Sequence, residues 1–387
     1  MNQIKLYNKI SKVGLDNLDA AKYVCSEEFE DYDAVLVRSA KLHDVVFPKN
    51  LKCIARAGAG VNNIPVDRCA EEGIVVFNTP GANANAVKEL VICALLLSSR
   101  KIVQGANWVR GLKGTPDIGP AAEKGKATYA GPEIAGKKLG VIGLGAIGVK
   151  VANAAVGLDM EVWGYDPFLS VDGALQLSRS VKHVTDLNEI FANCDYITVH
   201  VPLLADTKGI IGEAAFEKMK DGVRVVNLAR GELVDEPAMA KALASGKVAC
   251  YVSDFASDVI LEQENAIVLP HLGASTPESE DNCAKMAVYE IAEYLEKGTI
   301  RNSVNFPNLK VPYETGYRMC MIHKNVQGMI GAITGVFSEE GANIENMGNR
   351  SRGDYAYTIM DISVEPNAAM IEKLGAIEGM ISVRAIG

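Results

Sequence analysis

Three glycines at a fixed spacing give the clearest chemical signal in this chain. Gly143, Gly145 and Gly148 form the pattern G-x-G-x-x-G between an apolar run and a helical pattern at residues 146–156. In such a setting the first glycine permits a tight turn, the second lets the backbone approach a pyrophosphate, and the third lets helix and strand pack closely. The helix N-terminus also offers unpaired N–H groups to an anion. The motif therefore predicts a dinucleotide site, although a bare glycine turn can show the same letters.

An acidic residue strengthens this prediction. The next apolar run, at 161–165, is followed by Asp166, which lies 18 residues after Gly148. A carboxylate about 20 residues beyond the motif commonly binds the ribose 2′-hydroxyl. Because a carboxylate at this position repels a 2′-phosphate, we expect NAD rather than NADP.

Three later apolar runs end in polar residues that suit hydride transfer. His200 lies in TVHVPL, Arg230 in NLARG and His271 in VLPHLGAST. Oxidation of a carbinol needs a group that takes the hydroxyl proton, and histidine titrates near neutral pH. The planar arginine fork can hold a carboxylate through two hydrogen bonds. Arg230 and His271 thus fit a 2-hydroxy acid, whereas His200 could simply pack beside the cofactor.

Two series of βα units are needed to position these residues. Apolar runs alternate with helical patterns through the first hundred residues and again from 139 to 269. This alternation predicts parallel sheets, which bind ligands at the carboxyl ends of their strands. In the first series those ends are followed by Arg38, Arg56, Gly58 and Asn78. Between the two series, the Gly- and Lys-rich stretch 111–138 predicts loops and a domain crossing.

The predicted fold is α/β, with two doubly wound parallel-sheet domains and a small α+β domain. A helical pattern covers 278–297, and the last seventy or so residues read as β-α-β-β-α-β. We expect a substrate domain at 1–95 and 280–305, an NAD domain at 96–279, a linker at 306–315 and a regulatory domain at 316–387. The substrate is expected in the cleft between the first two.

Composition limits the possible partners. The chain has 387 residues and a net charge of −9, which argues against nucleic-acid and anionic-membrane surfaces. Its eight cysteines show no CxxC and no metal-ligand spacing, so reduced thiols and no metal site are expected. No secretory signal is visible at the N-terminus, and the apolar stretch 90–97 is far shorter than the roughly 20 residues of a membrane span. We expect a cytoplasmic protein.

Several runs of sequence resemble the D-2-hydroxyacid dehydrogenase family over about residues 30–305. They are NTPGANANAVKE (78–89), VIGLGAIG, TVHVPLLADTKGII, NLARGELVDEPAM and LPHLGAST. The closest resemblance is to members that oxidise D-3-phosphoglycerate to 3-phosphohydroxypyruvate, the first step of serine biosynthesis. It implies a flavodoxin-like substrate domain, a Rossmann NAD domain, His271 as acid/base, and Arg230 as the ligand of the substrate carboxylate and carbonyl. The residues expected to bind NAD are Gly143, Gly145, Ala146, Ile147, Gly148, Asp166, His200, Pro202, Ala229 and Asp254.

The acidic partner of His271 is less clear, because the family commonly has LDVFxxEP where this chain has YVSDFASDVILEQE. Asp254 fits the strand-end aspartate of the family, and Asp258 is the expected partner. Glu262 and Glu264 remain alternatives, and Asp258 could also be an ordinary surface residue.

A phosphorylated substrate needs cations in addition to Arg230. Arg56 is the first candidate and Arg38 the second, with Gly58 and Asn78 beside them and the backbone N–H groups of 57–61 as an anion nest. The alternative is that Arg56 forms an ordinary surface ion pair.

The C-terminal residues resemble the ACT-type amino-acid-binding module. His323, Asn325 and Asn343 match the serine-binding positions of the family, while Gln327 stands where proline is common. The resemblance therefore implies a possible serine effector and a homo-oligomer, and a purely structural dimerisation module is the alternative. Two other functions stay open: another 2-hydroxyacid dehydrogenase, such as a hydroxypyruvate or glyoxylate reductase, and a non-catalytic NAD-sensing protein.

Overall fold

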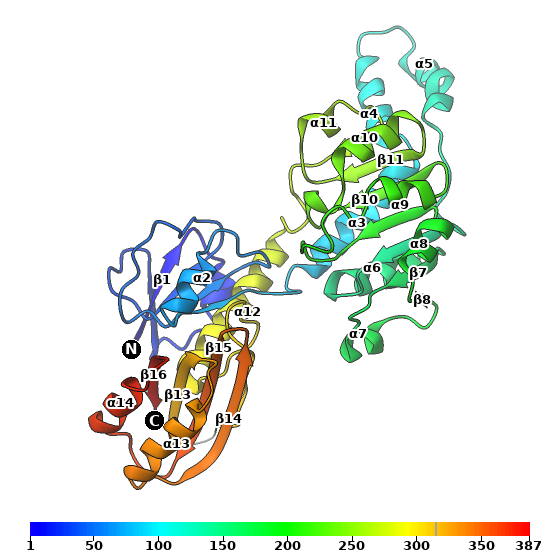
Figure 1. The fold of residues 1–387 in the computed structure, drawn as a ribbon. Helices are drawn as coiled ribbons and strands as arrows, with labels where there is room; N and C mark the ends of the chain where they lie inside the picture. The colour runs from blue at the N-terminus through cyan, green and yellow to red at the C-terminus, as the bar shows by residue number, and fades with distance from the viewer. Residues whose placement is uncertain (314–315) are drawn as a thin grey trace. The chain divides into compact units, whose positions relative to one another are not determined.

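The computed structural model describes residues 1–313 and 316–387, so Glu314 and Thr315 of the expected linker lie outside the described residues. The chain forms two compact units (Figure 1). Unit 1 comprises Met1–Asn83 and Pro277–Gly387, and unit 2 comprises Ala84–Thr276. No helix in the described ranges is long and apolar enough to cross a membrane.

Unit 1 contains a five-stranded parallel sheet in the order β2-β1-β3-β4-β5. This order is that of flavodoxin-like sheets, as expected. Its strands are β1 (Asn2–Tyr7), β2 (Tyr23–Ser26), β3 (Ala34–Val37), β4 (Cys53–Arg56) and β5 (Val75–Phe77), and its helices are α1 (Lys12–Leu15), α2 (Val66–Glu71) and α12 (Pro277–Lys297). All four residues of β3 are buried, as the continuous apolar run AVLV requires of a strand covered on both faces.

Helix α12 covers this sheet with one apolar stripe. Ala284, Ala287, Val288 and Ile291 recur at helical spacing and are buried in the same core as the strands. Gly298 ends the helix with a φ of 69°, a conformation that favours glycine. The predicted helix at 278–297 is therefore confirmed almost residue for residue.

Unit 2 contains a seven-stranded parallel sheet in the order β12-β11-β10-β9-β6-β7-β8, an extended Rossmann order. The strands are β6 (Lys138–Ile142), β7 (Glu161–Tyr165), β8 (Lys182–Val184), β9 (Tyr196–Val199), β10 (Val223–Asn227), β11 (Val248–Ser253) and β12 (Ala266–Val268). The helices are α3 (Ala84–Ser99), α4 (Ile102–Gly111), α5 (Ile118–Gly125), η1 (Lys126–Tyr129), α6 (Ala146–Val156), α7 (Val171–Gln176), α8 (Leu187–Asn193), α9 (Glu213–Lys218), η2 (Gly231–Leu233), α10 (Glu236–Ala244) and α11 (Asp258–Leu261).

The boundary between the units lies before α3, whereas the sequence places it at residues 95–96. Helix α3 buries Val87, Val91 and Leu95 in the core that also contains strands of the unit 2 sheet, so it belongs with that sheet. Its apolar pattern shows that the helix is buried but not which of the two sheets it covers.

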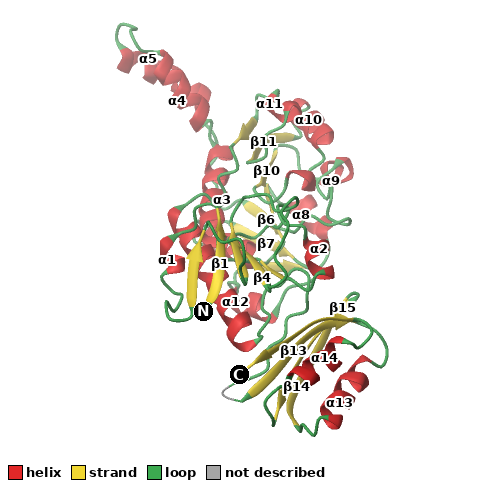
Figure 2. Cartoon of the chain, turned by 90° about the vertical axis from the view of Figure 1, so that its left-hand side faces the viewer, coloured by secondary structure: helices red, strands yellow, loops and turns green. Residues whose placement is uncertain are grey.

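Helix α5 and the short helix η1 occupy part of the stretch 111–138, for which the sequence predicts loops. Helices α4 and α5 form an arm that projects from the sheet of unit 2 (Figures 1 and 2). Neither helix has a buried residue, and Trp108 stacks on Tyr129 within the arm. The glycines and prolines of this stretch hide the helical pattern, which explains why the sequence predicts loops.

The C-terminal module has the predicted β-α-β-β-α-β order. Its elements are β13 (Tyr317–Lys324), α13 (Met329–Glu339), β14 (Ile344–Arg352), β15 (Tyr355–Ile362), α14 (Ala368–Gly375) and β16 (Met380–Ile386). The sheet is antiparallel, in the order β14-β15-β13-β16, and both helices cover one face (Figure 2).

The module is fused to unit 1 rather than attached by a free linker. Cys320, Ile322, Tyr357 and Ile359, on the face away from the module's helices, are buried in the same core as α12 and the parallel sheet. The expected linker is also packed, because Phe306, Leu309 and Val311 are buried.

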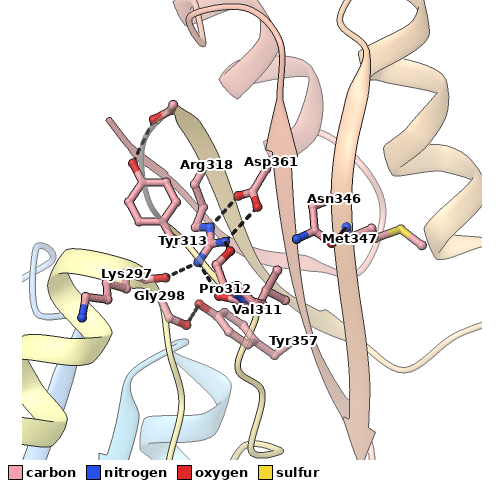
Figure 3. A network of polar contacts seen from close by, with 11 residues as sticks. Lys297, Gly298, Val311, Pro312, Tyr313, Arg318, Asn346, Met347, Tyr357 and Asp361 are labelled. Atoms are coloured by element: carbon pink, nitrogen blue, oxygen red, sulfur yellow. Dashed lines mark hydrogen bonds and ion pairs between the residues drawn. The ribbon is translucent and has the colours of Figure 1, made fainter.

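Donors from the module cap the C-terminal end of α12 (Figure 3). Arg318 is fully buried and donates to the Lys297 carbonyl at 2.8 Å. It also forms a bidentate ion pair with Asp361, with distances of 2.6 and 2.8 Å. The Tyr357 hydroxyl donates to the Gly298 carbonyl at 2.7 Å, and Arg384 donates to the carbonyls of Tyr294 and Leu295. The last carbonyls of a helix lack N–H partners from a following turn, and cations favour a helix C-terminus. Of the four carbonyls, that of Tyr294 also accepts from the Gly298 N–H at 2.9 Å.

Candidate active site

The glycine loop after β6 has the geometry that its sequence predicts. Gly143 has a φ of 92°, and a Cβ there would lie 2.7 Å from the His200 carbonyl oxygen. A Cβ at Gly148 would lie only 1.9 Å from the Gly143 carbonyl oxygen, so helix and loop touch at this point. A Cβ at Gly145 would meet no atom of the described chain within 4 Å. The first and third glycines are thus needed by the fold, and the second leaves open space where a pyrophosphate would approach.

Asp166 lies beside this loop. One carboxylate oxygen accepts a hydrogen bond from the Leu144 N–H at 2.8 Å and the other from the Phe168 N–H at 2.8 Å. Each oxygen keeps a lone pair for a hydroxyl group. Ala146 and Ile147, two further predicted cofactor residues, form the first turn of α6, where N–H groups are unpaired. The residues predicted to bind the dinucleotide phosphates and ribose therefore share one end of the sheet.

His200 is placed to pack beside this loop rather than to exchange protons. Its N–H donates to the Ile142 carbonyl at 2.7 Å, and its Nε2 shares a hydrogen bond with the Thr198 hydroxyl at 3.0 Å. Burial lowers the pKa of His200 to about 4, so the imidazole is neutral. Its Nδ1 is buried without a partner in the described chain. Pro202 follows at the start of a turn closed by Thr207, whose hydroxyl donates to the Pro202 carbonyl at 2.6 Å.

Arg230 follows β10 in a turn that Asn227 holds. The buried Asn227 side chain accepts from the Ala229 N–H at 3.1 Å and donates to the Arg230 carbonyl at 2.8 Å. The Arg230 side chain is exposed, and within the described chain it donates only to the neighbouring Ala229 carbonyl, at 2.6 Å. Its guanidinium therefore has donors left for a carboxylate.

His271 follows β12 and has a left-handed backbone, with a φ of 52°. This conformation is uncommon outside glycine and concentrates at functional sites. The His271 N–H donates to the carbonyls of Asp254 and Leu269, both at 3.1 Å. The exposed imidazole meets the Phe255 ring edge to face, with a centroid distance of 5.0 Å. The turn thus leaves the His271 side chain exposed to solvent.

Asp254 connects the two catalytic candidates electrostatically. One carboxylate oxygen accepts from the Gly273 N–H at 3.1 Å, and the other is buried without a partner in the described chain. Burial raises the pKa of Asp254, while the positive charges of His271 and Arg230 oppose that rise. His271 and Arg230 therefore both lie within electrostatic reach of the Asp254 carboxylate. An unpartnered buried oxygen is costly, and a bound polar group would satisfy it.

Asp258, the expected partner of His271, begins the short helix α11. Its carboxylate is exposed and forms no hydrogen bond or ion pair with His271 in the described chain. Glu262 and Glu264 are also exposed. The identity of the acidic partner thus stays a prediction.

Unit 1 brings together the four residues predicted to bind the substrate. Arg56 Nε donates to the Arg38 carbonyl at 3.0 Å, and the Asn78 amide donates to the Ala59 carbonyl at 2.6 Å. A Cβ at Gly58 would lie 2.6 Å from Arg56 Nη1. We call Arg38, Arg56, Gly58 and Asn78 the anion group.

Sequence reasoning missed one member of this neighbourhood, Glu280. Its carboxylate pairs with Arg38 at 2.6 Å from the first turn of α12. No spacing signal exists for this pair, because the two residues lie far apart in the chain.

The predicted regulatory residues do not come together within one chain. His323 is buried, and its two ring nitrogens bond to the Thr358 hydroxyl and the Lys324 carbonyl at 2.9 and 2.8 Å. Asn325 bonds to Gly353 and Asp354 at the β14–β15 turn, whereas the Asn343 N–H bonds to Ser363 beyond the other end of β15. Because β15 has eight residues, these asparagines are separated by roughly 20–25 Å.

The described residues contain no cluster of three or more metal-ligating side chains. All eight cysteines are free, and burial raises the pKa of most of them, Cys53 to about 12, for example.

Comparison with known proteins places this geometry in a family. Residues 92–273 match the family described as D-isomer specific 2-hydroxyacid dehydrogenase, NAD binding domain. The D-3-phosphoglycerate dehydrogenase of Escherichia coli K12 is 32% identical over 345 residues, which cover 84% of this chain and 79% of that protein. The Archaeoglobus fulgidus protein of the same name is 40% identical over 293 residues, 73% of this chain. The chain spans about half of that relative's length, 53%.

Among solved structures, the NAD-bound 3-phosphoglycerate dehydrogenase of Entamoeba histolytica is similar, with a TM-score of 0.62 and 28% sequence identity. The likeness covers 80% of this chain and 99% of that one.

The glycine geometry predicts two different outcomes for two similar substitutions. Gly148→Ala places a methyl group against the Gly143 carbonyl and should lower the free energy of unfolding by about 1–3 kcal/mol. Gly145→Ala has room and an ordinary φ of −74°, so stability should change by less than about 1 kcal/mol. The Kd for NAD should nevertheless rise more than about tenfold, because the methyl group would occupy the space of the pyrophosphate. Urea denaturation and calorimetric titration measure both effects. Unchanged NAD affinity in Gly145→Ala would contradict the assignment of this loop.

Proposed function

Because the chain belongs to the D-isomer-specific 2-hydroxyacid dehydrogenase family, we propose that it oxidises D-3-phosphoglycerate to 3-phosphohydroxypyruvate with NAD. One observation carries the proposal: an exposed imidazole on a strained turn and an exposed guanidinium lie within electrostatic reach of a buried carboxylate, in the same unit as a dinucleotide loop. A protein that only senses NAD has no need of this group.

Three residues of unit 2 are assigned separate roles in the reaction. The loop of Gly143, Gly145 and Gly148 with Asp166 would hold NAD, which would supply the acceptor for the hydride of substrate C2. His271 takes the proton of the C2 hydroxyl, so that the carbinol becomes a carbonyl. Arg230 holds the substrate carboxylate in a fixed orientation through its planar fork. Asp258 is assigned as the carboxylate that stabilises the resulting imidazolium, although its side chain is not bonded to His271 here.

The phosphate is assigned to the anion group. Arg56 and Arg38 supply positive charge, and the backbone N–H groups of 59–61 supply further donors. The N–H groups of Ala57 and Gly58, which the sequence also placed in this nest, donate instead to the carbonyls of Val37 and Arg56, both at 2.8 Å. One contact favours a second candidate function. Arg38 is already paired with Glu280, which reduces the charge available to a phosphate. A reductase of unphosphorylated acids such as hydroxypyruvate or glyoxylate is therefore the alternative.

The C-terminal module is assigned to serine binding between two copies of the chain. Asn325 and Asn343 lie at opposite ends of one sheet, so a ligand that touches both needs residues from a second chain. The arm of unit 2 also supports a homo-oligomer. Helices α4 and α5 have ten and eight residues and no buried side chain, and isolated helices shorter than about 12–15 residues are marginal in water.

A substrate panel tests the proposed function. The rate of NADH formation should be at least about tenfold higher, as kcat/KM, with D-3-phosphoglycerate than with D-glycerate or D-lactate, because only the first satisfies the anion group. The reverse reaction with hydroxypyruvate and glyoxylate is measured in parallel. Turnover of the unphosphorylated acids alone would establish the alternative and refute the first assignment.

Substitutions at the catalytic group test the assigned roles. His271→Ala should lower kcat by about 10²–10⁴ while NAD binding is retained, because only the proton acceptor is lost. Asp258→Asn should lower kcat more than Glu262→Gln or Glu264→Gln. Steady-state kinetics and NAD titration check these outcomes. A larger effect of either glutamate would transfer the role of acidic partner to that residue, and full turnover without His271 would refute its role.

The proposed serine site between two chains predicts both an effect of serine on the rate and an oligomeric protein. Millimolar serine should lower the rate of the wild-type protein, and Asn325→Ala should abolish this inhibition without changing the basal rate. Sedimentation should show a dimer or larger assembly. A monomer, or a rate that is unaffected by serine, would leave the module as a structural part of unit 1.

A further inference from the structure

A buried carboxylate in the middle of α12 has no part in the chemistry assigned so far. Glu290 is 2% exposed, and its Oε1 accepts a hydrogen bond from the Asn302 side-chain amide at 2.7 Å. Its Oε2 is buried and has no partner in the described chain. Burial raises the pKa of Glu290 to about 8, against the opposing effects of the Asn302 hydrogen bond and the Arg301 charge. The side chain is therefore mostly a neutral acid at pH 7, and its nearest buried neighbours along the helix, Ala287, Val288 and Ile291, are apolar.

Asn302 is the only hydrogen-bonding partner of the Glu290 side chain in the described chain, and its backbone conformation is unusual. Its φ is 57°, in the left-handed region, and the residue lies just after the end of α12. Its carbonyl accepts a hydrogen bond from the Asn78 N–H at 3.3 Å, and Ser303 bridges to Phe77. The bond from Asn302 to Glu290 thus ties the segment beside β5 to α12.

The next link leads from Asn78 into the anion group. The Asn78 side-chain amide donates to the Ala59 carbonyl at 2.6 Å, and the Thr79 N–H donates to the Gly58 carbonyl at 3.1 Å. Gly58 in turn lies against the guanidinium of Arg56. A continuous series of contacts therefore runs from Glu290 through Asn302 and Asn78 to the loop 57–61.

We propose that Glu290 is a positioning residue for the anion group: by holding Asn302 it fixes Asn78 and the loop 57–61, against which Arg56 is placed. The effect on substrate binding rests on the proposed function, whereas the positioning of the loop does not. An acid with one unsatisfied oxygen destabilises a core that an apolar side chain would fill better. Its presence is explained by what it holds in place.

The experiment compares Glu290→Ala with Glu290→Gln in the full-length chain. Glu290→Ala removes the acceptor, so KM for D-3-phosphoglycerate should rise about tenfold or more, while KM for NAD stays within about twofold because its residues lie in unit 2. Glu290→Gln keeps an oxygen acceptor of the same reach, without charge, and should restore KM to near the wild-type value. A purely structural role would change stability without this division between the two KM values.

A matched control is available on the same helix. Glu296 is also a carboxylate of α12, but it binds Lys22 and Tyr23 at the other edge of the sheet. Glu296→Ala should leave both KM values unchanged. If Glu290→Ala does not fold, Asn302→Gly carries the test, because glycine accepts the φ of 57° and lacks the amide that Glu290 holds.

Amide hydrogen exchange separates this inference from the proposed function. Peptides that contain 57–61 and Asn78 should exchange faster in Glu290→Ala, or in Asn302→Gly, than in the wild-type protein and in Glu296→Ala. Unchanged exchange there overturns the inference, whatever the substrate. Faster exchange with an unchanged KM for D-3-phosphoglycerate overturns its functional part. A wild-type protein that does not oxidise D-3-phosphoglycerate refutes the proposed function, and the exchange data then decide the positioning alone.

Discussion

The backbone carbonyls at the C-terminal end of α12 need donors, and three side chains from the last seventy or so residues supply them. Arg318 is the central one, because it is fully buried, pairs with Asp361 and donates to Lys297. Loss of one partner of a buried ion pair costs about 3–5 kcal/mol. The module is therefore joined to the rest of unit 1 through a charged network inside an apolar core. Fixing one end of α12 also fixes what the helix carries along its length, including Glu290 and Glu280.

Buried polar atoms without a hydrogen-bond partner lower the stability of the folded chain. The buried atoms without partners in the described chain include His200 Nδ1, Asp254 Oδ1, Thr79 Oγ1 and Glu290 Oε2. Three of the four residues follow the carboxyl end of a strand, and the fourth supports a loop at such an end. Each unpaired group costs about 1–3 kcal/mol, so a fold optimised only for stability would not keep them. Four further atoms, which belong to neither the catalytic group nor the anion group, are also buried without a partner in the described chain: Asn63 Oδ1, Arg68 Nε, Gln104 Oε1 and Arg384 Nε.

The environments of the charged side chains differ between the two units. In unit 2, burial raises the pKa of Asp254 and lowers the pKa of His200 to about 4, so the imidazole of His200 is neutral. The charges of His271 and Arg230 oppose the rise at Asp254. In unit 1, Arg38 is compensated by Glu280. The net charge of −9 says nothing about either arrangement, because it sums over a surface of which these residues are a small part.

The sequence by itself determined the glycine loop, Asp166, the order of the C-terminal elements and the strand ends that carry Arg230 and His271. These features depend on neighbours within about 20 residues, so motif and periodicity are enough. Only the tertiary structure decided that α3 belongs to unit 2, that Arg38 pairs with Glu280, that Glu290 holds Asn302, and that Asn325 and Asn343 lie apart. Each of these depends on which sheet a helix covers or on the register of distant strands. Packing between residues far apart in the chain determines which sheet a helix covers and how distant strands pair, so no local sequence pattern predicts either.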